Sequence, residues 1–90
     1  MGNIKKDDLM EHIQELADLY YQNQVSKGSQ KLQSLVQELT AVAPLLQPKE
    51  QQEYLVMLQG FMEAMELKDY VMMADILTFD ILEAIYSYKI

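Results

Sequence analysis

The chain has 90 residues, no cysteine, and a net charge of −7 from 14 acidic and seven basic side chains. Without cysteine it can form neither disulfides nor thiolate metal sites. All of its basic residues are lysines, and an acidic chain without arginine is a poor match for phosphate, so we expect neither nucleic acid nor an anionic membrane as a partner. Half of the residues are hydrophobic, which predicts one folded domain over residues 1–90.

The N-terminal segment lacks the features of a signal peptide. Its lysines, Lys5 and Lys6, are followed by Asp7 and Asp8 instead of an apolar core. No stretch of the chain approaches the roughly 18 apolar residues of a membrane-spanning helix. We therefore expect a cytoplasmic protein.

The first expected helix covers residues 7–24. Its apolar residues recur at helical spacing on one face: Leu9, Ile13, Leu16, Ala17 and Tyr20. Asp7 or Asp8 is expected to cap its first amides. The tripeptide Lys27-Gly28-Ser29 is expected to separate this helix from the next, with Gly28 ending the turn and Ser29 capping the second helix.

The second expected helix covers residues 30–43 and ends before Pro44, which disfavours helix in the residue that precedes it. Its apolar stripe consists of Leu32, Leu35, Val36, Leu39, Val42 and Ala43. The third covers residues 48–66 and begins at Pro48, because proline suits the first turn of a helix. Its inward residues are expected to be Tyr54, Leu55, Leu58, Phe61, Met62 and Met65.

Gly60 lies in the middle of the third helix, where glycine costs about 1 kcal/mol relative to alanine. Ala64 follows one turn later, so the two residues form a small-residue notch. Either another helix approaches closely at this notch, or Gly60 is simply tolerated.

The last expected helix covers residues 70–88, with Asp69 as its N-cap. It carries two apolar stripes on opposite faces. The first consists of Tyr70, Met73, Ala74, Leu77, Ile81, Ala84, Ile85 and Tyr88; the second consists of Met72, Phe79 and Tyr86, with Ile76 and Leu82 beside it. A helix that is apolar all round is either central in its own bundle or covered by something else.

Acidic and polar residues surround the second stripe, as at the rim of a protein interface. One hypothesis is therefore that Met72, Ile76, Phe79, Leu82 and Tyr86 form an interface. The alternative is that the last helix is central and that the other three helices cover both of its faces.

Four amphipathic helices with short connections predict an all-α fold, an antiparallel, up-down-up-down four-helix bundle. Two stacked helical hairpins, as in helical repeat proteins, are the alternative. No repeat of about 34 residues supports that second arrangement.

Chemistry-bearing residues are few. His12 is the only histidine, and the acidic residues Glu11 and Glu15 beside it would repel a phosphoryl group, so phosphotransfer is a weak hypothesis. No Glu-x-x-His, nucleophile elbow or Gly-rich phosphate loop is present. We therefore expect no catalytic residue, no cofactor and no dedicated metal ligand. Binding of a small ligand or a divalent metal remains an alternative, with the acidic cluster of the last two helices as the ligands: Glu66, Asp69, Asp75, Asp80 and Glu83.

The segment from Lys68 to Leu82 resembles the last helix of small, uncharacterised four-helix proteins of low-GC Gram-positive bacteria. Their pattern is roughly Lys-Asp-Tyr-Val-x-x-Ala-Asp-x-Leu-x-x-Asp/Glu-x-Leu. Tyr21-Gln22-Asn23 and the leucines of the second helix match their earlier part. The resemblance covers about half of the chain and implies no ligand. In size and fold such proteins are similar to flagellar and secretion chaperones.

These features together predict a non-enzymatic protein-interaction module. It would bind either a second copy of itself, as a homodimer, or a helical client, in the manner of a chaperone or adaptor. It would bind through the Met72, Phe79 and Tyr86 stripe, with the aromatic and methionine side chains as anchors.

Overall fold

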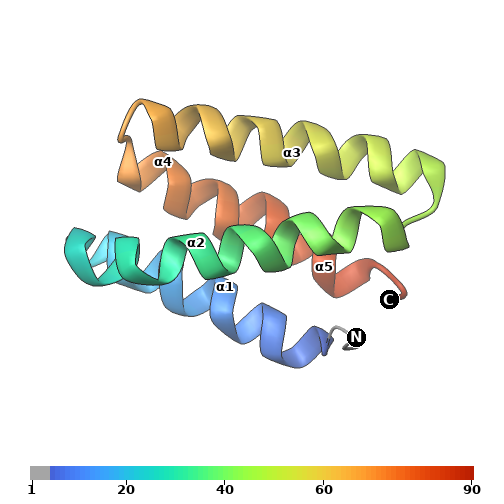
Figure 1. The fold of residues 1–90 in the computed structure, drawn as a ribbon, viewed down its shortest axis with the longest axis horizontal. Helices are drawn as coiled ribbons and strands as arrows, with labels where there is room; N and C mark the ends of the chain where they lie inside the picture. The colour runs from blue at the N-terminus through green and yellow to red at the C-terminus, as the bar shows by residue number, and fades with distance from the viewer. Residues whose placement is uncertain (1–4) are drawn as a thin grey trace.

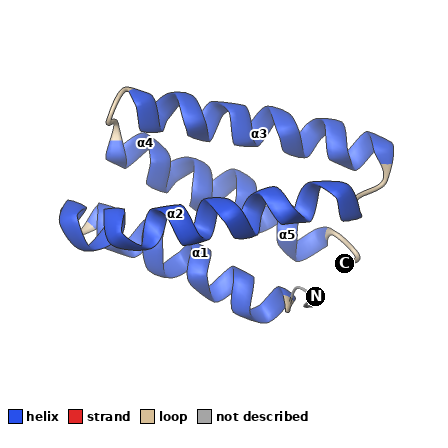
Figure 2. Cartoon of the chain, viewed as in Figure 1, coloured by secondary structure: helices blue, strands red, loops and turns tan. Residues whose placement is uncertain are grey.

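The computed structural model describes residues 5–90 and is an all-α four-helix bundle (Figure 1; Figure 2). Its first three helices are α1 (Lys6–Tyr21), α2 (Val25–Val42) and α3 (Pro48–Glu66), and a short 3₁₀ turn, η1 (Ala43–Leu45), follows α2. The C-terminal helix is the continuous run of α4 (Tyr70–Asp75), η2 (Ile76–Ile81) and α5 (Leu82–Ser87). Successive helices run in opposite directions (Figure 1), so the predicted fold class is confirmed. Residues 1–4 of the segment expected to lack a signal peptide lie outside the described residues.

The C-terminal helix lies against both α1 and α3, and α1 also lies against α2. Lys6 at the start of α1 donates a hydrogen bond to the carbonyl oxygen of Tyr88, so both helices meet at one end of the bundle. Between α2 and α3, the Tyr54 hydroxyl donates to the carbonyl oxygen of Leu39 at 2.7 Å. The four helices therefore enclose one shared core and do not form two separate hairpins.

The predicted apolar stripes supply most of this core. The whole α1 stripe is buried, as are Leu35, Leu39 and Val42 of α2. From the first stripe of the C-terminal helix, six residues are buried: Met73, Ala74, Leu77, Ile81, Ile85 and Tyr88. Burial of these side chains from four helices supplies the main driving force for folding.

The prediction for α3 was partly wrong. Tyr54 and Phe61 are fully buried, but Leu55 and Met62, expected to face inward, are 48% and 41% exposed. Ala64 is buried instead. The reason is that the C-terminal helix packs on the side of α3 that carries Ala64, whereas the opposite side, toward α2, is covered less completely.

The turn between α1 and α2 also differs from the prediction. The helix ends at Tyr21, and Asn23 takes the left-handed conformation with φ of 61°. The amide of Gln24 donates to the carbonyl oxygen of Leu19 at 2.8 Å, the hydrogen bond of a Schellman C-cap. Asparagine tolerates this conformation, so Asn23 takes the role expected of Gly28.

The residues expected at the two helix starts have other roles. Gly28 is buried inside α2, and Ser29 lies within the same helix and caps nothing. At the start of α1, Lys5 is the N-cap residue and no side chain caps the helix. Asp7 and Asp8 lie in its first turn, where their negative charges interact favourably with the positive end of the helix dipole.

The turn between α3 and the C-terminal helix agrees with the prediction. Lys68 is left-handed with φ of 56°, and the amide of Asp69 donates to the carbonyl oxygen of Ala64 at 2.9 Å. The Asp69 carboxylate then accepts a hydrogen bond from the amide of Met72 at 3.1 Å. Asp69 is therefore the N-cap of the last helix, as expected.

The C-terminal helix is not a regular α-helix, because η2 is a π-helical segment. Its fully buried residues Met73, Leu77, Ile81 and Ile85 are spaced four apart. In an α-helix each four-residue step rotates a side chain by about 40°, so this stripe would drift by about 120° over three steps. A π-turn holds more residues per turn and cancels part of that drift. The π segment therefore keeps all four side chains directed into the core.

Tyr54 makes the stability of the bundle sensitive to alkaline pH. Burial raises the pKa of its hydroxyl above the ordinary value of 10, and the nearby Tyr88 raises it further. As the pH rises through about 10, tyrosines of the unfolded chain ionise first, while Tyr54 stays neutral in the fold. We expect the contribution of Tyr54 to the free energy of unfolding to be constant below that pH and to be lost above it.

The Tyr54→Phe variant should lose about 1 kcal/mol at neutral pH, because the hydrogen bond to Leu39 is removed. It should also show a smaller loss of stability above pH 10. Urea unfolding followed by circular dichroism, over a series from neutral to alkaline pH, measures both effects. The matched control is Tyr86→Phe, whose side chain is 72% exposed. An equally steep alkaline fall in Tyr54→Phe and wild type would contradict the assignment.

Candidate functional site

Exposed apolar side chains concentrate on the second half of the chain. Among residues 5–90, ten large hydrophobic side chains are exposed, and eight of them lie on α3, the C-terminal helix or the turn that joins them. They are Leu55, Val56, Met62, Leu67, Val71, Met72, Phe79 and Tyr86. Exposed apolar side chains gathered on one part of a molecule are typical of interaction sites.

The three main residues of the predicted interface are exposed. Met72 is 47%, Phe79 63% and Tyr86 72% accessible, whereas Ile76 and Leu82 are half-buried against the core. The alternative, in which the other three helices cover both faces of the last helix, is therefore wrong for Met72, Phe79 and Tyr86. None of the three is enclosed by the other helices of residues 5–90.

The predicted interface residues do not form one straight strip. Seven-residue spacing aligns side chains only in a regular α-helix, and η2 lies between Met72 and Tyr86. Ile76 faces α3: its Cδ1 lies 3.8 Å from the position that a Cβ on Gly60 would occupy. Tyr86 lies near α1, with the Lys6 Nζ 6.0 Å from its ring centroid. The two ends of the set therefore adjoin different neighbours, and Phe79 lies between them.

The small-residue notch belongs to the contact between α3 and the C-terminal helix. Ala64 is buried there, and Gly60 is half-buried with only Ile76 near its missing Cβ. The helix that approaches this notch is the chain's own last helix. The remaining space beside Gly60 is open.

These positions define an apolar hairpin surface, made of Val56 and Gly60 on α3 and Met72, Ile76 and Phe79 on the C-terminal helix. Val56 and Gly60 are one turn apart, as are Met72 and Ile76, and Ile76 of the second helix lies opposite Gly60 of the first. Phe79 follows Ile76 by three residues. The sequence missed Val56, although its position outside the inward stripe of α3 was a usable signal.

The acidic residues of the last two helices are used in part for structure. Asp69 caps α4, and Asp75 accepts a hydrogen bond from the hydroxyl of Tyr21. That hydrogen bond raises the pKa of Tyr21 above its ordinary value. Within residues 5–90, no three His, Cys, Asp or Glu side chains come together as a group that could hold a metal ion.

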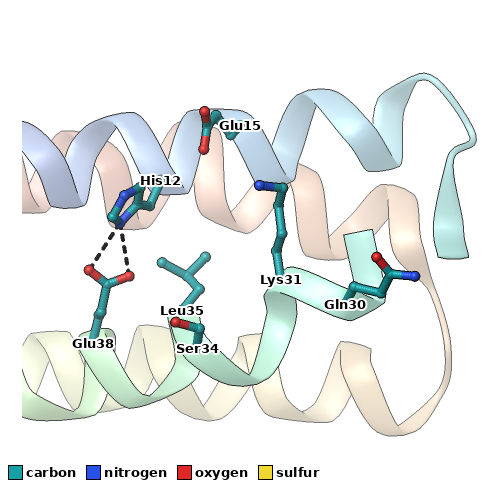
Figure 3. Close-up of a pocket in the computed structure, with 7 residues that line it drawn as sticks. All are labelled: His12, Glu15, Gln30, Lys31, Ser34, Leu35 and Glu38. Atoms are coloured by element: carbon teal, nitrogen blue, oxygen red, sulfur yellow. Dashed lines mark hydrogen bonds and ion pairs between the residues drawn. The ribbon is translucent and has the colours of Figure 1, made fainter. Parts of the chain in front are cut away.

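His12 lies in a shallow polar groove of about 260 Å³ between α1 and α2 (Figure 3). Its Nδ1 is 3.0 Å from both carboxylate oxygens of Glu38. Lys31 reaches from α2 toward α1 along the same groove, and Glu15 lies on α1 between His12 and the end of Lys31 (Figure 3). The ring is 46% exposed, and the carboxylate beside it is unfavourable for a phosphoryl group. This geometry matches a surface ion pair and adds no support to phosphotransfer.

The helical bundle matches a known protein family. Residues 6–90 match a family described as a domain of unknown function, DUF8042. The chain belongs to this family. Because the match begins at the first residue of α1 and continues past α5, all four helices lie within the family's domain.

Searches of curated proteins and of solved structures gave no match to this chain. In the part that the structure describes, no helix combines the length and the apolar character needed to cross a membrane. The description of the family assigns no activity.

Proposed function

We propose that this member of the DUF8042 family is a non-enzymatic protein-interaction module that associates through the apolar hairpin surface. The observation that carries the proposal is the 63% exposure of Phe79, a large aromatic side chain in the middle of a well-packed helix. Aromatic and methionine side chains are enriched in the cores of protein interfaces, and Met72 on the same helix is also exposed. Leaving them in water gives up the free energy that their burial would contribute.

A partner helix is the element that suits this surface. The two helices of the hairpin run antiparallel, and open space remains beside Gly60 where they touch. A helix laid along them would present apolar residues at helical spacing to Val56, Met72 and Phe79. The partner would be either a second copy of the chain or a helical client, as for a chaperone or adaptor. We place the module in the bacterial cytoplasm, in keeping with the sequence resemblance.

The alternative predicted from sequence, a small-ligand or divalent-metal site on the acidic cluster, has no comparable support. Asp69 and Asp75 already make hydrogen bonds within the fold. The remaining members, Glu66, Asp80 and Glu83, are exposed. No further observation favours them as ligands.

The variant Phe79→Asp tests the proposal. Because the side chain is exposed, we expect the free energy of unfolding to change by no more than about 0.5 kcal/mol. Association should be lost, because a charge at the centre of an apolar contact is strongly unfavourable. Light scattering over a concentration series measures self-association, and co-purification with the tagged chain measures binding of a client.

The matched control is Leu45→Asp, an apolar residue with 53% exposure that lies in η1, outside the hairpin surface. Circular dichroism of both variants should show wild-type helicity. Unfolding of Phe79→Asp would mean that Phe79 is part of the core. Equal association of wild type and Phe79→Asp would count against the proposal.

A further inference from the structure

The charge around the apolar hairpin surface indicates the chemistry of its partner. Residues 48–87 contain eight acidic side chains and two lysines. The lysines, Lys49 and Lys68, lie at the first turn of α3 and in the turn before the C-terminal helix. The C-terminal helix itself carries three acidic side chains and no lysine. The apolar surface is therefore set in a strongly negative half of the molecule.

Three carboxylates lie directly beside the apolar residues. Asp80 follows Ile76 by four residues, Glu83 follows Phe79 by four, and Glu63 follows Gly60 by three. Residues three or four apart lie within about one helical turn of each other, both in the α-helix α3 and in the π segment. All three carboxylates are exposed, and none makes an ion pair with a lysine of residues 5–90. Their charge is available to a partner.

A second copy of the chain fits this surface poorly. In a two-fold symmetric dimer the same patch meets itself. The carboxylates of Asp80, Glu83 and Glu63 would then face carboxylates, and like charges across an interface are unfavourable. No lysine of the C-terminal helix is present to offset them.

We infer that the partner is a basic amphipathic helix of another protein, an inference that rests on the proposed function. Its apolar face covers Val56, Met72 and Phe79. Lysine or arginine side chains on its flanks reach the three carboxylates and steer the encounter. That helix can approach the backbone at Gly60, where only Ile76 lies within 4 Å of the position of a Cβ.

The inference is tested with two synthetic peptides of about 18 residues, roughly five turns of helix. Both carry the same leucine face with one tryptophan. One carries lysine and the other glutamate on the flanks. The chain contains no tryptophan, so the peptide's fluorescence reports binding alone. We expect the lysine peptide to bind, more weakly as salt is added, and the glutamate peptide not to bind.

Variants locate the binding site. Phe79→Asp should weaken binding of the lysine peptide by about 30-fold or more, as for a central anchor residue. The double variant Asp80→Lys/Glu83→Lys should weaken it by about tenfold, through the loss of two rim charge pairs. The matched control is Glu11→Lys/Glu15→Lys, which makes the same charge change at exposed positions of α1.

Equal loss in the double variant and its control would mean attraction to net charge only and would overturn the inference. Binding of both peptides alike, or of neither, would also overturn it. If light scattering shows a dimer that Phe79→Asp dissociates, the partner is a second copy, so the inference is wrong while the proposed function stands. If Phe79→Asp alters neither peptide binding nor solution mass, both fail.

Discussion

Replacing Gly28 with alanine should lower the free energy of unfolding by about 1–3 kcal/mol, the range for an overpacked core position. Alanine is the better helix former, so helix propensity alone predicts the opposite sign. The reason is the close approach of Tyr20. A Cβ on Gly28 would lie 2.5 Å from Cε1 and 2.9 Å from Cδ1 of that ring. The ring is 2% exposed and packs against Tyr70, with centroids 5.1 Å apart, so it has little room to move.

Gly60→Ala is the matched control for this prediction. Gly60 is also a mid-helix glycine, but an added Cβ would make ordinary contact with Ile76 at 3.8 Å. This variant should gain about 0.5–1 kcal/mol. Urea unfolding measures both variants. In a Tyr20→Leu background the penalty at Gly28 should largely disappear, because the clashing ring is gone. A stabilised Gly28→Ala protein would show that α2 and Tyr20 lie farther apart than described.

Deleting a single residue should abolish folding in α3 but be tolerated in the C-terminal helix. Removal of Gln59, an exposed residue of α3, rotates every later residue of that helix by about 100°. Tyr54 and Phe61, both fully buried, would then point to different faces. Loss of a buried phenylalanine alone costs about 3–5 kcal/mol, a large part of the stability of a small domain.

Removal of Thr78 should have the opposite outcome. It lies within η2, and its deletion leaves Leu77 and Ile81 three residues apart. Spacings of four, three and four place Met73, Leu77, Ile81 and Ile85 on one face of a regular α-helix. The shortened chain should fold with a continuous last helix and lose no more than about 1 kcal/mol, the scale of an ordinary point mutation.

Thermal unfolding followed by circular dichroism distinguishes the two deletions. The Gln59 deletion should show no cooperative transition, and the Thr78 deletion should show one close to that of the full chain. Carbon chemical shifts of the last helix would show whether the π segment has been replaced by α-helix. Equal damage from both deletions would mean that the π segment is not a response to the four-residue spacing.

The helices and most of the core could be predicted because both depend on local spacing. The α1 stripe is buried as a whole, because apolar residues on one face of a helix are removed from water together when that face packs against other helices. Its residues are Leu9, Ile13, Leu16, Ala17 and Tyr20. Asp69 could be identified as a cap from its place before an apolar run. For α3 the spacing was ambiguous, because its apolar residues are spread around more than half of the helix circumference. Leu55 and Met62 were therefore placed inside wrongly.

The exposure of the candidate site could be anticipated only as one of two alternatives. A second apolar stripe indicates that another element packs against it. Spacing within one helix does not tell whether that element belongs to the same chain or to a partner. The lateral positions of α1 and α3 leave Phe79 and Met72 in solvent. Ile76 lies near α3 and Tyr86 lies near α1, because the π segment changes the direction of side chains between them. The seven-residue spacing of the stripe in the sequence did not indicate this difference.

An all-α bundle of four helices and most of its shared core could therefore be predicted from local patterns, because helical periodicity and caps act over a few residues. Packing between the helices determined the position of Gly28 within α2 and the faces that stay exposed to solvent. Asn23 and Gly28 can both end a helix, and the ring of Tyr20 excludes a side chain at residue 28, which keeps glycine inside α2. The π segment likewise arises because packing against α1 and α3 outweighs regular α-helical geometry in the last helix.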